Sequence, residues 1–295
     1  MFGVYRNRMK GREKKQSRIR IWIQLAFTCL FNGYAVGFFK GEIFNKETKA
    51  FCVPVLNCYS CPGALGSCPI GALQASLGKR KGKFPFYVLG ILVMFGVLFG
   101  RLLCGFVCPF GFFQDLLYKI PGKKLTVNKK IDKPLRLFKY AVLAIVVVLF
   151  SLFLKDGGAS VPWFCKYICP AGTLEGGIPL VTANGELREL VGGLFTWKLG
   201  VLFAIIIASV FIGRFFCRYI CPLGAFYSLF NKFSFYRMDV DKGKCTDCKK
   251  CEQVCIMATS VIKNCNAAEC IRCGKCKAAC PTNAIKTHFG RAQNE

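Results

Sequence analysis

Two cysteine runs near the C-terminal end constrain this chain of 295 residues more than any other feature. Both have the spacing C-x2-C-x2-C-x3-C, and Pro281 follows the second run. The first run is Cys245, Cys248, Cys251 and Cys255, and the second is Cys270, Cys273, Cys276 and Cys280. This spacing binds two [4Fe–4S] clusters, and the fourth cysteine of each run ligates the other cluster. We therefore assign Cys280 to the cluster of the first run and Cys255 to the cluster of the second.

Ile256 departs from this pattern, because a proline usually follows the fourth cysteine of the first run. The alternative is a pair of structural zinc knuckles, but zinc sites do not need a fourth cysteine at this offset. The sequence predicts an α+β domain of the bacterial-ferredoxin type over residues 236–295.

Four long apolar runs precede this domain and are typical of membrane-spanning helices. They cover about residues 21–39, 84–103, 137–154 and 197–216. The fold class expected for residues 21–235 is therefore an α-helical integral membrane domain with four transmembrane helices. Residues 1–20 carry eight Lys and Arg residues, so we expect this N-terminus in the cytoplasm, and four spans return residues 236–295 to the same side.

The charges of the loops favour this orientation in a prokaryotic cytoplasmic membrane. Residues 104–139 carry eight basic residues and residues 155–197 carry three. Lys79, Arg80, Lys81 and Lys83 argue against it, because they would lie on the outer side. The Gly-rich segment 62–78 is too short to cross alone, and we expect it to be a re-entrant or interfacial segment. The net charge of +27 reflects these basic flanks and does not indicate a nucleic-acid partner.

A repeat relates the two halves of the membrane domain. Residues 100–119 read GRLLCGFVCPFGFFQDLLYK and residues 213–232 read GRFFCRYICPLGAFYSLFNK, and nine of the twenty positions match. The outer loops contain CPIGAL from Cys68 and CPAGTL from Cys169. Each half therefore has the order span, outer C-P-x-G, span, inner C-P-x-G, which is a parallel repeat.

The inner motifs predict a further redox centre held by Cys104, Cys108, Cys217 and Cys221. Cysteines at i and i+4 lie on one helical face. Pro109 and Pro222 should stop or kink the helix, which places the thiols at helix ends. Inert buried thiols are the alternative, since free cysteine packs well.

The outer cysteines are less clearly grouped. We expect four of Cys58, Cys61, Cys68, Cys165 and Cys169 to hold an outer centre, and the choice among them stays open. Disulfides facing an oxidising exterior are the alternative. The roles of Cys29, Cys52 and Cys265 are left open. His288 is the only histidine and no C-x-x-C-H occurs, which excludes paired-His haem and c-type haem attachment, and no haem is expected. Up to four [4Fe–4S] clusters are expected, with a quinone as a further candidate cofactor.

Arg101 and Arg214 stand three residues before the two inner C-x3-C-P motifs. One interpretation is that they tune the potential of a cluster. The other is that they anchor the helices by reaching water at the interface.

The motifs C104-GFV-C108-P and C217-RYI-C221-P, the four spans and the double cysteine run together resemble the NapH/NosR/CcoG group of membrane polyferredoxins. This resemblance implies electron transfer at the cytoplasmic membrane, from quinol or reduced carriers to an exported reductase, and in some members maturation of copper or other metal centres. The flavin-bearing extracytoplasmic domain of the larger NosR-type members is expected to be absent.

Three functional hypotheses follow, and none of them assigns a catalytic residue. The first is a conduit from the C-terminal domain through the inner and outer centres to an extracytoplasmic acceptor. The second is a maturation or regulatory factor that reduces a metal or disulfide of a client. The third is a quinol dehydrogenase subunit with a quinone among residues 110–118 and 226–233. The expected partners are redox donors and acceptors or quinol, the bilayer and a membrane complex.

Overall fold

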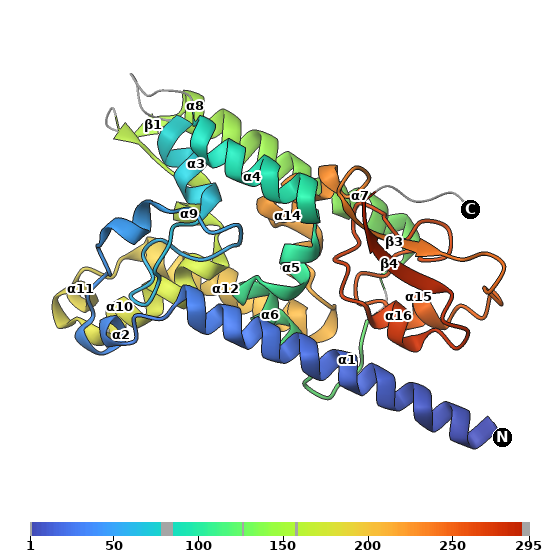
Figure 1. Cartoon of the computed structure of the whole chain (residues 1–295). Coiled ribbons are helices and arrows are strands. Elements are labelled where there is room, and N and C mark those ends of the chain that lie inside the picture. The colour runs from blue at the N-terminus through green and yellow to red at the C-terminus, as the bar shows by residue number, and fades with distance from the viewer. Residues whose placement is uncertain (1, 78–84, 126, 157–158, 291–295) are drawn as a thin grey trace.

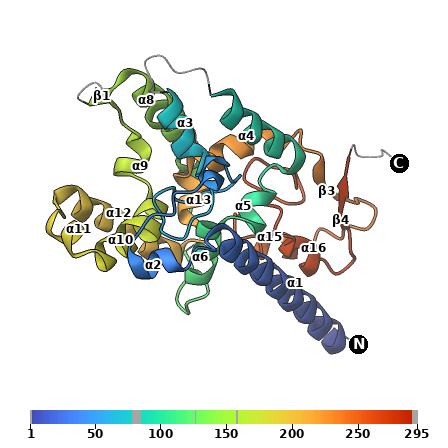
Figure 2. The same cartoon turned by 60° about the vertical axis from the view of Figure 1, so that its left-hand side comes forward.

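A computed structural model describes residues 2–77, 85–125, 127–156 and 159–290. The chain forms a helical part, up to residue 235, and a smaller C-terminal domain. The C-terminal domain lies at one end of the molecule beside the N-terminal half of α1, and α2, α10 and α11 lie at the other end (Figures 1 and 2).

The elements of the helical part are α1 (Phe2–Phe31), α2 (Val36–Lys40), η1 (Glu47–Ala50), α3 (Pro69–Leu77), α4 (Phe86–Phe99), α5 (Leu102–Phe106), α6 (Pro109–Leu117), α7 (Lys129–Ala141), η2 (Val142–Leu149), α8 (Phe150–Phe153), β1 (Lys155–Asp156), β2 (Ala159–Ser160), α9 (Trp163–Tyr167), η3 (Gly172–Gly177), α10 (Ile178–Ala183), α11 (Gly185–Glu189), α12 (Gly193–Phe211), α13 (Phe215–Tyr219) and α14 (Pro222–Phe230).

The C-terminal domain is built on an antiparallel strand pair, β3 (Tyr236–Val240) and β4 (Ile285–Phe289). Two short helices, α15 (Lys250–Gln253) and α16 (Lys275–Ala279), complete it. Met238 and Ile285 are buried in its core with cysteines of both runs. The domain is therefore α+β. Because its apolar core is small, the two cysteine runs occupy the space between the strands and the helices.

Two helices of the described residues are long and apolar enough to cross a membrane, residues 130–153 and 193–211. Helix α4 has 14 residues, about 21 Å at 1.5 Å per residue, which is less than a typical span. It ends where Gly100 takes a positive φ of 54°. The four-span arrangement is therefore not confirmed and stays a prediction.

The first expected span is not one helix. Helix α1 ends at Phe31, and α2 begins only at Val36. Leu65 packs against the intervening Gly33, and the Leu65 N–H donates to the Phe31 carbonyl, so the chain after α1 is held by the segment before α3. The expected interfacial segment 62–78 contains helix α3, and Lys79, Arg80, Lys81 and Lys83 lie outside the described residues.

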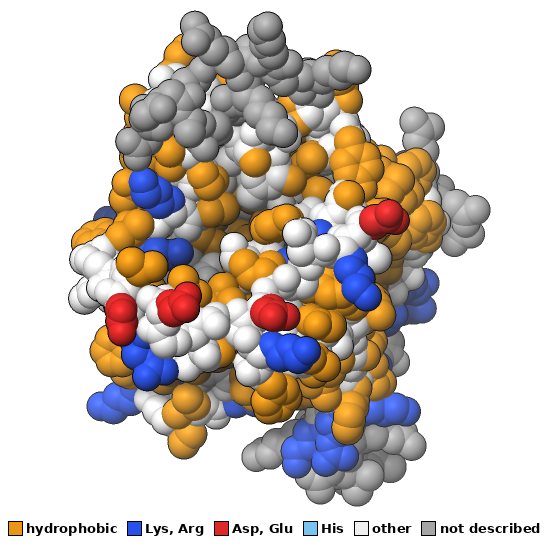
Figure 3. Space-filling view, turned by 90° about the vertical axis from the view of Figure 1, so that its left-hand side faces the viewer, with side chains coloured by type: hydrophobic (Ala, Val, Ile, Leu, Met, Phe, Trp, Pro, Cys, Tyr) orange, Lys and Arg blue, Asp and Glu red, His pale blue; other side chains and the backbone are white. Residues whose placement is uncertain are grey.

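Large apolar side chains are exposed along the outside of the helical part. Trp22, Phe86, Phe153 and Phe203 are among them, with exposed fractions of 65 to 76%. On the face that carries the end opposite the C-terminal domain, hydrophobic side chains are widespread, and acidic and basic side chains lie among them in a band across the face (Figure 3). Soluble monomers rarely expose apolar surface on this scale, so the helical part is suited to a lipid environment.

The C-terminal domain docks closely on the ends of the repeat. A Cβ on Gly105 would overlap the carbonyl oxygen of Ile271, and a Cβ on Gly213 would lie 2.7 Å from Cγ2 of Ile256. Ile256 is the residue that replaces the usual proline, and it forms this contact with the helical part. The Asn231 side chain donates to the Cys270 carbonyl at 2.8 Å. These contacts bring the second cysteine run against the inner motifs.

We predict that Gly105→Ala weakens this docking, because a methyl group there meets backbone that cannot move independently. The expected loss is about 1–3 kcal/mol, the usual cost of overpacking. Thermal unfolding in detergent, with limited proteolysis near residue 235, measures it. Gly90→Ala is the matched control, since nothing lies within 4 Å of a Cβ at that position. Equal unfolding temperatures for the two variants would contradict the prediction.

Candidate metal centres

Two small pockets in the C-terminal domain are lined by cysteines of both runs. The first has a volume of about 20 Å³, and its cysteines are Cys245, Cys248, Cys251 and Cys280. The second also has a volume of about 20 Å³, and its cysteines are Cys255, Cys265, Cys270, Cys273 and Cys276. The fourth cysteine of each run thus lies with the other run. Cys265 differs from the rest because its Sγ donates to the Met238 carbonyl at 2.6 Å. Ligation by the predicted sets stays a prediction.

A third pocket, of about 10 Å³, gathers the inner cysteines Cys104, Cys108, Cys217 and Cys221. Its remaining walls include Pro54, Val55 and Leu56, which come from the segment before α3. All four thiols are at most 7% exposed. The two halves of the repeat therefore meet here and present four thiols to one enclosed space.

The local structure of the C-P-x-G motif differs from expectation. The proline does not end the helix that carries both cysteines, because α5 and α13 already end at Phe106 and Tyr219. Instead Cys108 and Cys221 are the N-cap residues of α6 and α14, and the proline is the first residue of the new helix. The Cys221 Sγ accepts the Gly224 N–H at 3.3 Å. The thiol therefore faces the positive end of a helix, which stabilises a thiolate.

Two arginines cross from one repeat to the other at the inner site. Arg101 donates to the Cys217 carbonyl at 2.9 Å and pairs with Glu269 at 2.7 Å. Arg214 donates to the Cys104 carbonyl and pairs with Asp115 at 2.6 Å. Both arginines are fully buried. They do not reach water, so the interpretation as interfacial anchors is wrong.

The glycine of C-P-x-G makes room for these arginines. A Cβ on Gly111 would lie 3.3 Å from the guanidinium of Arg214, and one on Gly224 would lie 3.2 Å from that of Arg101. Such distances are shorter than ordinary van der Waals contact, so a larger residue would push the guanidinium away from the cysteine backbone.

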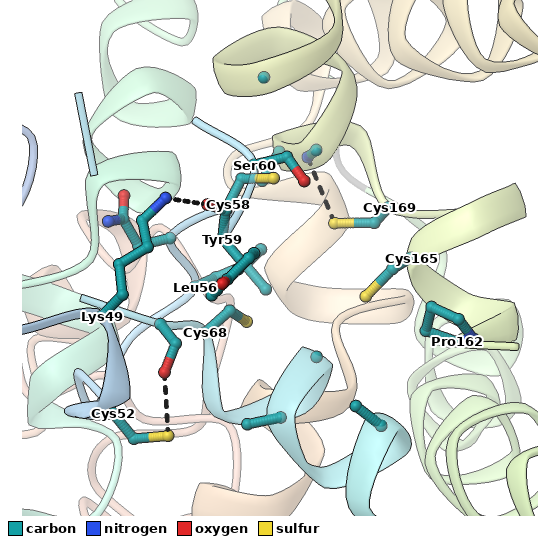
Figure 4. Close-up of a pocket in the computed structure, with 18 of the residues that line it drawn as sticks. Lys49, Cys52, Leu56, Cys58, Tyr59, Ser60, Cys68, Pro162, Cys165 and Cys169 are labelled. Atoms are coloured by element: carbon teal, nitrogen blue, oxygen red, sulfur yellow. Dashed lines mark hydrogen bonds between the residues drawn. The ribbon is translucent and has the colours of Figure 1, made fainter. Parts of the chain in front are cut away.

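A fourth and larger cavity, of about 580 Å³, lies at the other end of the molecule. Cys58, Cys68, Cys165 and Cys169 face it from three segments of the chain (Figure 4). Cys52 is also on the wall, but its Sγ is hydrogen-bonded to the Ser67 hydroxyl at 3.3 Å. Cys61 does not line the cavity, and its Sγ lies 3.5 Å from the Asn32 side-chain oxygen. Four of the five candidate outer cysteines thus line one cavity, and their ligation stays a prediction.

Sequence reasoning missed a third C-x3-C-P motif that was visible in the sequence. Residues 165–170 read CKYICP, close to the CRYICP of residues 217–222. It also missed three polar residues that follow a C-P cysteine by six positions: the buried Gln74 and Gln114 and the half-buried Glu175. The Glu175 carboxylate accepts the Cys58 N–H at 2.9 Å, and burial raises its pKa to about 7.

The donor sets fit [4Fe–4S] clusters better than single metal ions. All 20 cysteines are free of disulfides, and the four sites contain no histidine. Among the described residues, no three His, Cys, Asp or Glu side chains converge closely enough to hold one ion. A [4Fe–4S] cluster is held by four thiolates, and each of the four sites is lined by at least four cysteines.

Comparison with known proteins supports the binding of several [4Fe–4S] clusters by this chain. A family described as "4Fe-4S binding domain" matches residues 67–87, 85–128, 138–178 and 193–238, and a second family of that description matches residues 266–286. An uncharacterized protein of Methanocaldococcus jannaschii is 33% identical over 223 residues, which are 74% of this chain and 82% of that protein. No solved structure matches the chain significantly.

Other relatives carry names that state an electron-transport role. A putative electron transport protein of Escherichia coli, YccM, is 24% identical over 77% of this chain and 64% of its own length. The ferredoxin-type protein NapH of Haemophilus influenzae is 25% identical over 66% of this chain and 65% of its own length. The class is thus that of ferredoxin-type electron-transport proteins that bind several [4Fe–4S] clusters. Within it, the chain belongs to the NapH-like polyferredoxin family.

We predict that Asp115→Asn destabilises the protein by about 3–5 kcal/mol, because it leaves Arg214 and Arg20 buried without their counter-charge. Burial alone would raise the pKa of Asp115, but the two guanidinium groups outweigh it and hold the pKa at about 2. The carboxylate's contribution is therefore present above about pH 4, the unfolded value, and is lost as the pH falls toward 2. Thermal unfolding measures the effect.

Asp241→Asn is the control for this variant. Its partner Lys244 is exposed and 3.8 Å away, so the loss should be at most about 1 kcal/mol. Comparable losses in both variants would mean that the buried pair contributes little.

Proposed function

We propose that the protein relays electrons across a membrane through four [4Fe–4S] clusters. The C-terminal domain holds two, with the ligand sets Cys245, Cys248, Cys251, Cys280 and Cys255, Cys270, Cys273, Cys276. The inner centre is held by Cys104, Cys108, Cys217 and Cys221, and the outer centre by Cys58, Cys68, Cys165 and Cys169. Bound clusters supply one-electron redox chemistry, and the protein sets their order and environment.

The observation that carries this proposal is that neighbouring sites share walls. Leu56 lines both the inner pocket and the outer cavity. At the other side of the inner site, Ile271 lines the second pocket of the C-terminal domain and touches Gly105, between Cys104 and Cys108. The second pocket of the C-terminal domain, the inner site and the outer cavity therefore follow one another along the molecule, and the buried core of the C-terminal domain joins Cys251 of the first pocket to Cys276 of the second. A bilayer core of about 30 Å is too thick for one efficient step, and such a series divides the distance.

The membrane arrangement is part of the proposal. Residues 21–235 form the membrane domain with four membrane-inserted segments, and α4 and the end of α1 are short ones. The basic segment 1–20 and the domain 236–295 lie in the cytoplasm. In support, Gln16 of α1 lies 3.4 Å from the Cys273 carbonyl, so these two parts are on the same side of the molecule.

Differences in the size and exposure of the four sites support an assignment of where electrons enter and leave the proposed relay. The outer cavity measures about 580 Å³, against about 10–20 Å³ for the other three sites. Its wall includes the half-exposed Lys198, which attracts an anionic or acidic partner surface, whereas Lys49 is buried and donates to the Tyr59 carbonyl. An extracytoplasmic acceptor would meet the outer centre here. At the opposite end, Cys248 is exposed and is the natural point of entry for a cytoplasmic donor.

The residues around the inner centre exclude water and balance charge. Phe110, Phe216 and Leu223 are at most 2% exposed and keep the thiols dry. Arg101 and Arg214 place positive charge beside them. An enclosed apolar site with fixed cations reorganises little when its charge changes, which suits an intermediate relay point.

A variant series tests the outer ligand set. Cys58→Ala should remove one centre and about four iron atoms per chain, because Cys58 faces the cavity. Cys61→Ala is the matched control and should leave the iron and sulfide content unchanged, since Cys61 lies off the cavity wall. Iron and sulfide analysis of anaerobic protein with EPR spectroscopy reads both. Loss of iron in the Cys61 variant with retention in the Cys58 variant would overturn the assignment.

Reconstitution tests the relay as a whole. Protein in liposomes with an entrapped oxidant should transfer electrons from an external low-potential donor, and the Cys104→Ala/Cys217→Ala variant should not. Equal rates for the two proteins, or no transfer by the wild type, would refute the conduit.

A quinol-oxidising role is the second candidate, and one observation favours it. An apolar cavity of about 570 Å³ lies between α1, α4 and α5, lined among others by Phe27, Phe31, Phe95 and Phe99. It also touches Leu103 and Val107, which flank the inner cysteines. The expected position between residues 110–118 and 226–233 differs from this one. Quinone analogues that slow cluster re-oxidation would support this role.

A further inference from the structure

Two buried glutamines occupy equivalent places in the two cysteine sites of the helical part. Gln74 follows Cys68 by six residues in α3, and Gln114 follows Cys108 by six residues in α6. Neither side chain is exposed to solvent. A buried amide is costly unless its donor and acceptor are both satisfied, so the partners of these two groups indicate why they are there.

Both amides make the same pair of contacts. The Gln114 Oε1 accepts the Phe216 N–H at 3.1 Å, and its Nε2 lies 3.0 Å from the Cys217 Sγ. The Gln74 Oε1 accepts the Phe164 N–H at 2.9 Å, and its Nε2 lies 3.4 Å from the Cys165 Sγ. The backbone N–H fixes the orientation of the amide, because only the carbonyl oxygen can accept it. One N–H of each amide is therefore aimed at sulfur, and Nε2 also lies 3.4 Å from the Phe110 carbonyl oxygen in Gln114 and 3.3 Å from the Ile70 carbonyl oxygen in Gln74.

The other two C-P cysteines are followed by different residues at this position. Glu175 accepts the Cys58 N–H, and the Tyr227 hydroxyl donates to the Pro54 carbonyl at 2.9 Å. These two side chains hold the ends of the segment 54–58, which runs between the inner and outer sites, and they do not contact the ligand sulfurs of their partner motif. Each site thus has one amide directed at one thiol.

We propose that Gln114 and Gln74 are positioning residues that raise the reduction potentials of the inner and outer centres by donating hydrogen bonds to the Cys217 and Cys165 sulfurs. This rests on the proposed function, in which these cysteines ligate clusters. A one-electron reduction adds negative charge that spreads onto the thiolate ligands. An N–H donor stabilises the more negative state, and it does so strongly where water is excluded.

The test compares Gln114→Leu and Gln74→Leu in the full-length, anaerobically purified protein by redox-titrated EPR. The Gln114→Leu variant should lower the midpoint of the inner centre by at least a tenfold change in the reduction equilibrium, about 59 mV for one electron. The Gln74→Leu variant should lower only the outer midpoint, and by less, because its N···S distance is longer. The centres of the C-terminal domain should not move, and each variant is the control for the other.

Gln114→Glu separates tuning from folding. It keeps an oxygen for the Phe216 N–H but replaces the donor with a carboxylate, so the inner midpoint should fall while the iron content is retained. An unchanged inner midpoint in a Gln114 variant that keeps its iron overturns the role of this glutamine. By contrast, wild-type protein with only about eight iron atoms, enough for two clusters, overturns the membrane centres and hence the proposed function. The two failures are therefore distinguishable.

Discussion

The exchange of arginines between the two repeats is the interaction on which the inner site depends. Four thiolates in an apolar interior repel one another, and burial alone would keep them protonated. Arg101 and Arg214 bring two cations to the backbone of the opposite repeat. Each is itself balanced by a carboxylate, Glu269 or Asp115. Because each arginine belongs to one repeat and serves the cysteines of the other, neither half can form the site alone.

The same interaction ties the C-terminal domain to the helical part. Glu269, which pairs with Arg101, directly precedes Cys270 of the second cysteine run. It also pairs with the buried Lys139 of α7. A buried ion pair adds little net stability, but removing one partner costs much stability because the other charge is left buried and unpaired. These pairs therefore favour a single docked arrangement of the C-terminal domain. The close approach of Gly105 to Ile271 then sets the second run against the inner cysteines, where a relay requires it.

The cysteine spacing and the repeat could be predicted from the sequence because both are local patterns with few alternatives. The crossing of Cys255 and Cys280 between the runs follows from the same spacing. The helix boundaries could not be predicted so well. Composition does not reveal that α1 ends at Phe31, where the Leu65 N–H donates to the Phe31 carbonyl. A proline such as that of C-P-x-G can either end one helix or begin the next, and the sequence does not distinguish the two. The choice among outer cysteines depended on a three-dimensional fact, that Cys61 lies off the cavity wall.

The inner and outer sites of the helical part have the same arrangement of cysteines but differ in the charged residues around them. This difference fits the positions of the two sites in the proposed relay. Both have C-P cysteines at helix starts and one amide directed at sulfur. The inner site adds two buried arginines, while Pro162 stands three residues before Cys165 where the inner motifs have an arginine. At the outer site positive charge comes from the half-exposed Lys198 on the cavity wall and from the buried Lys49. Charges fixed in the interior act only on the centre beside them. A charge on an open wall also acts on a molecule that approaches, so in the proposed relay Lys198 would attract the partner that takes an electron from the outer centre.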